Sequence, residues 1–175
     1  MALKNVNEVD VKRAQELSTA IELVHFGFRA MIARPDEVLA KRGLTRVHHR
    51  ILYFVARSPE LSVNTLLRTL GVTKQALNRP LRDLCAQGLV RMERSQDDGR
   101  VKRLRLTATG ARLEARLSSL QQEHFAAAFE RAGRDAEAGW RAAMAALASP
   151  ELIKSGRDLP GGPMLDASPG VLPSR

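Results

Sequence analysis

Apolar side chains recur at steps of three and four residues along most of the chain, which is the spacing of one buried face of an α-helix. The helices predicted in this way cover residues 9–34, residues 35–43, the segment from Thr45 to Ser58, residues 107–133 and a last segment ending near residue 148. Pro35 is expected to end the first helix and begin the next, because proline removes a hydrogen bond and crowds the preceding turn. Thr45 and Thr107 are expected to be N-caps.

Two shorter helices joined by a tight turn are predicted in the middle of the chain. Ser62 suits the N-cap of the first, Gly71 suits the turn because glycine tolerates positive φ, and Thr73 suits the N-cap of the second. The second helix contains KQALNRPLRDL, residues 74–84, with Pro80 in its interior. We expect Pro80 to lie on the inner face and to bend the helix, because one backbone hydrogen bond is missing there.

After residue 88 the hydrophobic pattern changes to an alternation of period two. The segments LVRMER and RVKRLRL flank SQDDG, and alternation on both sides of an Asp–Gly pair predicts a β-hairpin. Its arms carry six basic residues, Arg91, Arg94, Arg100, Lys102, Arg103 and Arg105. Asp98 either makes the turn or orients a neighbouring arginine such as Arg100.

These elements together predict a mainly α protein, a winged helix-turn-helix with a small β-hairpin wing and long N- and C-terminal dimerisation helices. The division expected is an N-terminal dimerisation helix (1–34), a winged helix-turn-helix DNA-binding domain (35–106), C-terminal dimerisation helices (107–148) and a flexible tail (149–175). A homodimer is expected because the first and last helices carry more apolar residues than a winged core can cover. The tail is rich in proline and glycine and has no periodicity.

Charge favours a polyanionic partner. The 175 residues include 28 Lys and Arg against 19 Asp and Glu, which gives a net charge of +9 and a pI of about 10.7. Nucleic acid is the partner that this balance favours, although a generally basic, solvated surface would give the same number. No apolar run approaches the ~20 residues of a membrane span, and no apolar leader is present. We therefore expect a soluble, cytoplasmic protein without a membrane partner.

The outward face of the helix at 74–84 has the side chains that read DNA. Five outward residues include no acid: Lys74, Gln75, Asn78, Arg79 and Arg82. Glutamine and asparagine pair with adenine, arginine pairs with guanine, and lysine contacts phosphate. A solvated helix face would explain the apolar spacing equally well, but not the absence of acids. In the wing, Arg100 is the residue expected to reach a groove, and Lys102 is expected to contact DNA beside it.

The order of elements, and above all DDGRVKRLRLTATG at residues 97–110, resembles the multiple-antibiotic-resistance regulator (MarR) family of bacterial winged-helix repressors. The resemblance covers about residues 10–148. It implies a homodimer that binds double-stranded DNA at a pseudo-palindromic operator, represses transcription, and is released by a small aromatic acid, a phenolic compound or an oxidant. By position it assigns the recognition face to Thr73, Gln75, Asn78, Arg79 and Arg82, and the wing arginine to Arg100. Pro80 departs from the family, which usually has an apolar aliphatic residue there.

The resemblance also implies an effector pocket between the dimer region and the DNA-binding region. The candidates for holding the carboxylate of an effector are His25, Arg29, His48 and His49, and ordinary surface or dimer contacts are the alternative. His48 and His49 point in different directions on a helix, so at most one of them is expected to face a pocket. Cys85, the one cysteine, is either a buried small hydrophobe or a redox sensor, although in oxidant-sensing relatives the cysteine lies near the start of the first helix.

Other functions have little support. No Cys or His pair has the spacing of a zinc clip, so we expect no metal and no cofactor. The sequence has no Gly-rich phosphate loop, nucleophile elbow or HExxH motif, so we expect no enzymatic activity. A winged-helix module that binds protein is the remaining alternative, and it would lack the steep salt dependence that phosphate contacts produce.

Overall fold

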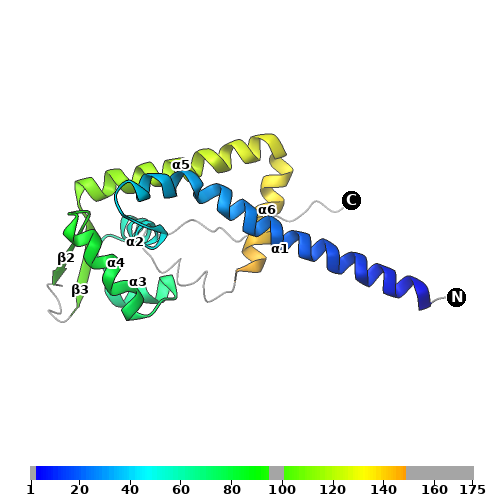
Figure 1. Cartoon of the computed structure of the whole chain (residues 1–175), viewed down its shortest axis with the longest axis horizontal. Helices are drawn as coiled ribbons and strands as arrows, with labels where there is room; N and C mark the ends of the chain where they lie inside the picture. Colours follow the sequence, from blue (N-terminus) through cyan, green and yellow to red (C-terminus); the bar gives the residue numbers. More distant parts are fainter. Residues whose placement is uncertain (1–2, 95–100, 149–175) are drawn as a thin grey trace.

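The computed structural model describes residues 3–94 and 101–148, with side chains from residue 10 onward (Figure 1). In chain order, the elements of this part are α1 (Leu3–Ala40), α2 (Arg46–Arg57), β1 (Leu61–Ser62), α3 (Val63–Leu70), α4 (Lys74–Ala86), β2 (Val90–Arg94), β3 (Lys102–Leu106), α5 (Ala108–Ala132) and α6 (Arg134–Leu147). The predicted fold class is confirmed, since helices dominate and the strands form one small sheet.

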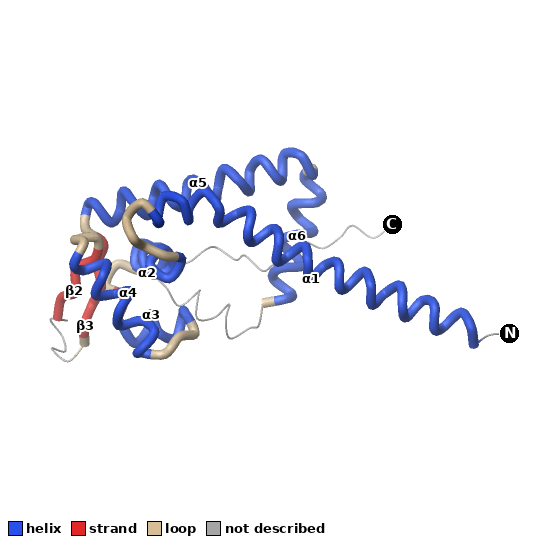
Figure 2. The backbone as a smooth tube through the Cα atoms, in the orientation of Figure 1, coloured by secondary structure: helices blue, strands red, loops and turns tan. Residues whose placement is uncertain are grey.

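The elements are arranged as a small unit of short helices and a sheet, with long helices beside it. Figures 1 and 2 show α2, α3, α4 and the sheet gathered at one end, while α1 and α5 lie side by side above them. The N-terminal half of α1 extends away from this body, and α6 turns back from the end of α5. In the described part of the chain, no helix has both the length and the apolar character that crossing a membrane requires.

The predicted helix break at Pro35 is wrong, because α1 continues through this proline to Ala40. Pro35 is fully buried, and Ile32 and Leu39, one turn before it and one turn after it, are buried too. An interior proline costs about 3 kcal/mol in a helix, and burying one such aliphatic side chain stabilises by about 1.5–3 kcal/mol. Burial of this face offsets the missing hydrogen bond. The second predicted helix is thus the end of α1, and Gly43, with φ of 66°, follows it in the turn.

Most helix ends predicted from the sequence are confirmed by their caps. The side chains of Ser62, Thr73 and Thr107 accept hydrogen bonds from the backbone N–H three residues on, at 3.0 to 3.2 Å. Gly71 ends α3 in the left-handed conformation, with φ of 62°. The core lies between α2, α3, α4, α5 and one face of the sheet. It is built mainly from leucines, including Leu52, Leu66, Leu77, Leu84, Leu104 and Leu117.

The predicted hairpin arms are confirmed as β2 and β3, and the residues between them, 95–100, lie outside the described part. The register pairs Val90 with Leu106, Met92 with Leu104 and Arg94 with Lys102. β1 was not predicted, because a strand of two residues has no period to detect. It pairs with the other edge of β3, so the sheet order is β1-β3-β2.

Candidate DNA-binding site

The helix-turn-helix formed by α3 and α4 places the predicted reading helix at the surface. Inside, Leu77, Leu81 and Leu84 of α4 are buried in the core. The turn is tied to α2, because Arg50 donates a hydrogen bond at 3.0 Å to the carbonyl oxygen of Leu70, the last residue of α3. This bond satisfies a carbonyl that the helix end leaves without a partner. The core contacts and this tie hold α4 at a fixed angle to α2 and α3.

The outward residues of α4 are exposed and unengaged. Five outward side chains of α4 are exposed, and none of them makes a hydrogen bond or an ion pair with another described residue. They belong to Lys74, Gln75, Asn78, Arg79 and Arg82. Thr73, also exposed, caps the helix through its hydroxyl. This face therefore presents amide and guanidinium donors whose bonding capacity is unused, as a base-reading surface requires.

Asp83 is the one acid of α4, and the structure turns it toward α2. Its carboxylate oxygen Oδ2 lies 3.5 Å from Nε2 of His48, an ion-pair distance without a hydrogen bond. The acid thus lies beside the reading face, on the side of α2.

α4 is a continuous helix across Pro80, whose ring is half-buried at the border between the core face and the exposed face. The inner position predicted for Pro80 is therefore met only in part. The predicted bend of α4 stays a prediction.

The sheet register sorts the basic residues of the wing onto two faces. Arg94 and Lys102 lie opposite each other in the sheet, and both are exposed. Neither side chain makes a hydrogen bond or an ion pair with a described residue. Arg91, Arg103 and Arg105 lie on the other face with Glu93. Arg94 was missing from the predicted contact set, although counting by two from Val90 and Met92 on one arm, and from Leu104 on the other, places Arg94 and Lys102 on the same face. Arg100, like Asp97 and Asp98, lies outside the described residues.

The other face of the wing is an ion-pair network. Arg105 pairs closely with the carboxylate of Glu60, and its Nε lies 3.9 Å from Glu93. The Nε atom of Arg91 lies 4.0 Å from the other carboxylate oxygen of Glu93. Arg103 donates a hydrogen bond at 3.1 Å to the backbone carbonyl of Glu60. These arginines have partners within the protein, whereas the side chains of Arg94 and Lys102 have none in the described part of the chain.

The four predicted effector residues are not brought together. His25 and Arg29 lie on the exposed part of α1, where the edge of the His25 ring contacts Phe26 with ring centroids 5.3 Å apart. His48 is buried, and its Nδ1 accepts a hydrogen bond at 2.9 Å from the backbone N–H of Thr45, which completes the cap of α2. Within the described chain, no hydrogen bond or ring contact joins the pair on α1 to the pair on α2.

His49 is buried like His48 but has different neighbours. Burial lowers the pKa of His49, while the nearby carboxylates of Glu114 and Asp36 act in the opposite direction. Its Nε2 atom is buried and has no hydrogen-bond partner in the described part. Glu114 is itself buried and accepts hydrogen bonds from Ser118 at 2.5 Å and from Arg57 at 3.4 Å. His49 of α2 thus lies near charged groups of α1, α2 and α5.

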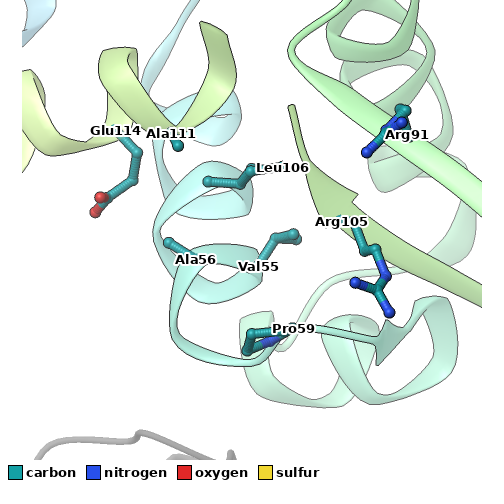
Figure 3. A pocket seen from close by; sticks show the side chains of 8 residues that line it. All are labelled: Val55, Ala56, Pro59, Arg91, Arg105, Leu106, Ala111 and Glu114. Atoms are coloured by element: carbon teal, nitrogen blue, oxygen red, sulfur yellow. The ribbon is translucent and has the colours of Figure 1, made fainter. Parts of the chain in front are cut away.

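One half-open cavity of about 270 Å³ lies beside the wing base (Figure 3). It is lined by Val55, Ala56, Pro59, Arg91, Arg105, Leu106, Ala111 and Glu114. No predicted effector residue lines it. Its two arginines already face Glu60 and Glu93, so the cavity has no surplus of positive charge to attract an anion.

Cys85 is half-buried, and burial raises the pKa of its thiol. A raised pKa favours the protonated thiol, which is the less reactive form. Within the described residues, no group of three or more His, Cys, Asp or Glu side chains is placed to hold a metal ion.

Comparison with known proteins identifies this arrangement. Residues 42–101 match the sequence profile of the MarR family. The chain is 41% identical over 138 residues to the HTH-type transcriptional regulator PetP of Rhodobacter capsulatus, covering 79% of this chain and 83% of PetP. It is 34% identical over 121 residues to the HTH-type transcriptional repressor Rv2887 of Mycobacterium tuberculosis, covering 59% of this chain and 87% of that protein.

Solved structures agree in fold. A MarR family transcription regulator superposes with a TM-score of 0.66 at 19% identity, covering 78% of this chain and 91% of that one. A mutant of Staphylococcus aureus MepR bound to an oligodeoxyribonucleotide gives a TM-score of 0.52 at 20% identity, covering 73% and 94%. NadR in complex with 4-hydroxyphenylacetate superposes with a TM-score of 0.61 at 25% identity, covering 74% of this chain and 92% of NadR. With the match to the family profile, the identity to PetP and this winged helix-turn-helix fold, the chain belongs to the MarR family of transcriptional regulators.

Proposed function

We propose that the chain is a sequence-specific repressor that binds duplex DNA as a homodimer and is released by a small aromatic acid or phenolic effector. The observation that carries the proposal is the exposed, unpaired face of α4, whose amide and guanidinium groups fit base edges in the major groove. The repressor Rv2887 supports repression, and the oligodeoxyribonucleotide on MepR supports DNA binding by this fold. No enzymatic activity is proposed.

In this proposal Gln75 and Asn78 read adenine, Arg79 and Arg82 read guanine, and Lys74 contacts phosphate. Lys102 and Arg94 contact the DNA backbone from the wing, and Arg100 reaches the groove beside them. Thr73 holds the start of α4 through its capping hydroxyl. The reading residues thus lie within 35–106, and the regions 1–34 and 107–148 pair the two copies, with α1 running across the first boundary.

The proposed dimer rests on apolar surface that one copy leaves uncovered. Large apolar side chains of α1 and α6 are exposed in the single chain, namely Val11, Leu17, Ile21, Leu23, Val24, Phe26, Phe28, Trp140 and Leu147. Contiguous apolar surface of this kind marks a protein interface. A twofold pair of α4 helices would also read two half-sites about one helical turn apart.

The proposed effector is a small aromatic carboxylate, because NadR holds 4-hydroxyphenylacetate. His25, Arg29 and His49 are the candidate contacts, and His48 is the weaker one, since its Nδ1 is already engaged by Thr45. Adding 4-hydroxyphenylacetate to the protein–operator complex should release the DNA, and Arg29→Ala should raise the concentration required. Retention of DNA at every concentration of this and related aromatic acids would remove this part of the proposal.

DNA recognition is tested with a labelled duplex carrying the inverted repeat of the gene's own promoter. Arg79→Ala should weaken specific binding by about 1–3 kcal/mol in fluorescence anisotropy titrations, because a guanine contact is lost. Arg131→Ala, which removes an exposed arginine at the far end of α5, should leave affinity unchanged. The logarithm of the affinity should also fall linearly with the logarithm of salt concentration. Equal binding by the two variants, or a flat salt dependence, would refute the proposed DNA face.

A further inference from the structure

Glu60 has an unusual backbone conformation at the junction between α2 and α3. Its φ is 74°, and in the described part of the chain it is the one residue other than glycine with a positive φ. Side chains with a β-carbon rarely adopt this conformation, so contacts elsewhere must hold it. Glu60 lies directly before β1, the short strand that pairs with β3 of the wing.

Two arginines of β3 supply these contacts. Arg103 donates a hydrogen bond at 3.1 Å to the backbone carbonyl of Glu60, and the Arg105 guanidinium forms a close ion pair with its carboxylate. Figure 3 shows the Arg105 side chain pointing toward Pro59, the neighbour of Glu60. The backbone carbonyl and the carboxylate of Glu60 therefore contact Arg103 and Arg105, two alternate residues of β3.

These contacts join the wing to the helix-turn-helix. β3 carries Lys102, one of the wing cations proposed to contact DNA, and Glu60 is joined through β1 to the start of α3. Because β1 has only two residues, backbone pairing alone is a short attachment for the root of β3. The ion pair and the hydrogen bond extend this attachment.

We infer that Glu60 is a positioning residue for DNA binding, which sets the direction of the wing relative to α4 through Arg103 and Arg105. The inference rests on the proposed function, since it concerns how the same surface engages duplex DNA. Glu60 itself touches no DNA in this scheme, and its effect passes through the wing.

Simple electrostatics predicts the opposite effect, which makes the inference testable. Glu60 is an acid beside a basic DNA-binding surface, so removing its charge should strengthen binding if only charge matters. If Glu60 positions the wing, removing its carboxylate should weaken binding in spite of the more favourable charge.

The experiment compares Glu60→Gln with Glu93→Gln in operator titrations with the full chain. Glu60 and Glu93 both face the arginines on one face of the wing, so the two changes remove the same charge there, but Glu93 makes only the longer contacts, at 3.9 and 4.0 Å. Glu60→Gln should weaken operator binding by roughly threefold to thirtyfold, the range expected when residues in contact are uncoupled. Glu93→Gln should leave binding unchanged or strengthen it. Equal or tighter binding by Glu60→Gln, with wild type binding normally, would overturn this inference alone.

Two further variants separate positioning from folding. Glu60→Gly removes the carboxylate but suits the positive φ, so it should raise the midpoint of thermal unfolding and still weaken DNA binding. The loss caused by Lys102→Ala should be smaller in the Glu60→Gln background than in wild type, because both changes act through the wing. Independent, additive losses would contradict the inference. Failure of the wild type to bind any duplex would instead overturn the proposed function, and this inference with it.

Discussion

Gly110 is the glycine of the described chain at which packing leaves the least room for a side chain. A β-carbon at this position would lie 1.9 Å from the backbone carbonyl oxygen of Leu89. The approach is close because Thr107 ties the start of α5 to this segment, with its hydroxyl donating to the carbonyl of Gly88 at 2.6 Å and its N–H donating to that of Leu89 at 3.0 Å. In the LTATG motif at residues 106–110, Gly110 is therefore needed for packing, and Thr107 is the N-cap of α5.

Gly110→Ala should lower the free energy of unfolding by about 3 kcal/mol or more, because backbone must move to admit the methyl group. Gly139→Ala is the matched control, since it is a helical glycine with no atom within 4 Å of a β-carbon. It should leave stability unchanged or raise it by up to about 1 kcal/mol. Urea denaturation of both variants gives the comparison. Similar stabilities for the two would show that the contact with Leu89 is not tight.

His49 should make stability depend on pH. Burial lowers the pKa of His49 in the folded chain, so the unfolded chain binds the proton more readily. The stability that neutral His49 allows is thus fully present above the unfolded pKa and is lost as pH falls through about 6.5 toward the lower folded value. In urea denaturation from about pH 7.5 to 5.5, His49→Leu should flatten this decline. His25→Gln, a change of an exposed ring, should retain it. An unchanged decline in His49→Leu would assign it to other groups.

At the scale of elements, the two interior prolines show that burial decides what a helix tolerates. α1 continues through Pro35, which is fully buried, and α4 continues through Pro80, which is half-buried. Buried Ile32 and Leu39 lie one turn before and one turn after Pro35, and α4 buries Leu77, Leu81 and Leu84 around Pro80. Tertiary packing therefore outweighs the cost of a proline inside a helix. For α4, the proline also bears on the direction in which the helix points.

Pro80→Leu tests whether α4 is aimed by its proline. Gln75 and Asn78 precede Pro80 and Arg82 follows it, so restoring the missing hydrogen bond would change the angle between these groups. Affinity should shift by about 1 kcal/mol or more between operators that differ at the bases facing Gln75 and Asn78. Anisotropy titrations over single-base operator variants measure the shift. An unchanged order of preference would mean that the proline is merely tolerated.

Across the whole molecule, apolar side chains are buried in the winged unit and left exposed on α1 and α6. The winged unit has a closed core, whereas residues 10–30 of α1 are exposed throughout, and α6 has no buried residue. Ile21 is 73% exposed and Leu23 66% exposed. The hydrophobic effect favours covering this surface with a second copy, which would also bring two reading helices to one operator.

Ile21→Glu should break the proposed dimer, because two copies would each bury a carboxylate among apolar side chains. The dimer dissociation constant should rise on the order of 100-fold or more, and operator affinity should fall with it. Gln15→Glu adds the same charge to α1 at an exposed polar position and should have little effect. Sedimentation velocity over a range of concentrations reports the assembly. A wild-type chain that stays monomeric would contradict the dimer directly.

The features that sequence patterns predict correctly depend on neighbours along the chain. Ser62, Thr73 and Thr107 are N-caps, Gly71 makes the turn, and the change of hydrophobic period at Val90 marks the hairpin. Each of these follows from contacts within one turn of helix or from the alternation of one strand, so local residues suffice to predict them.

Other features depend on contacts between residues far apart in the chain, and the three-dimensional structure is needed to see them. Burial against α2 and α5 carries α1 through Pro35, and pairing with β3 makes a strand of Leu61 and Ser62. The basic residues of the wing look equivalent in sequence, yet register and the contacts of Glu60 and Glu93 divide them into those with a partner within the protein and those whose side chains have none among the described residues. Contacts between distant residues carry this information, and a periodic pattern along one chain does not contain it.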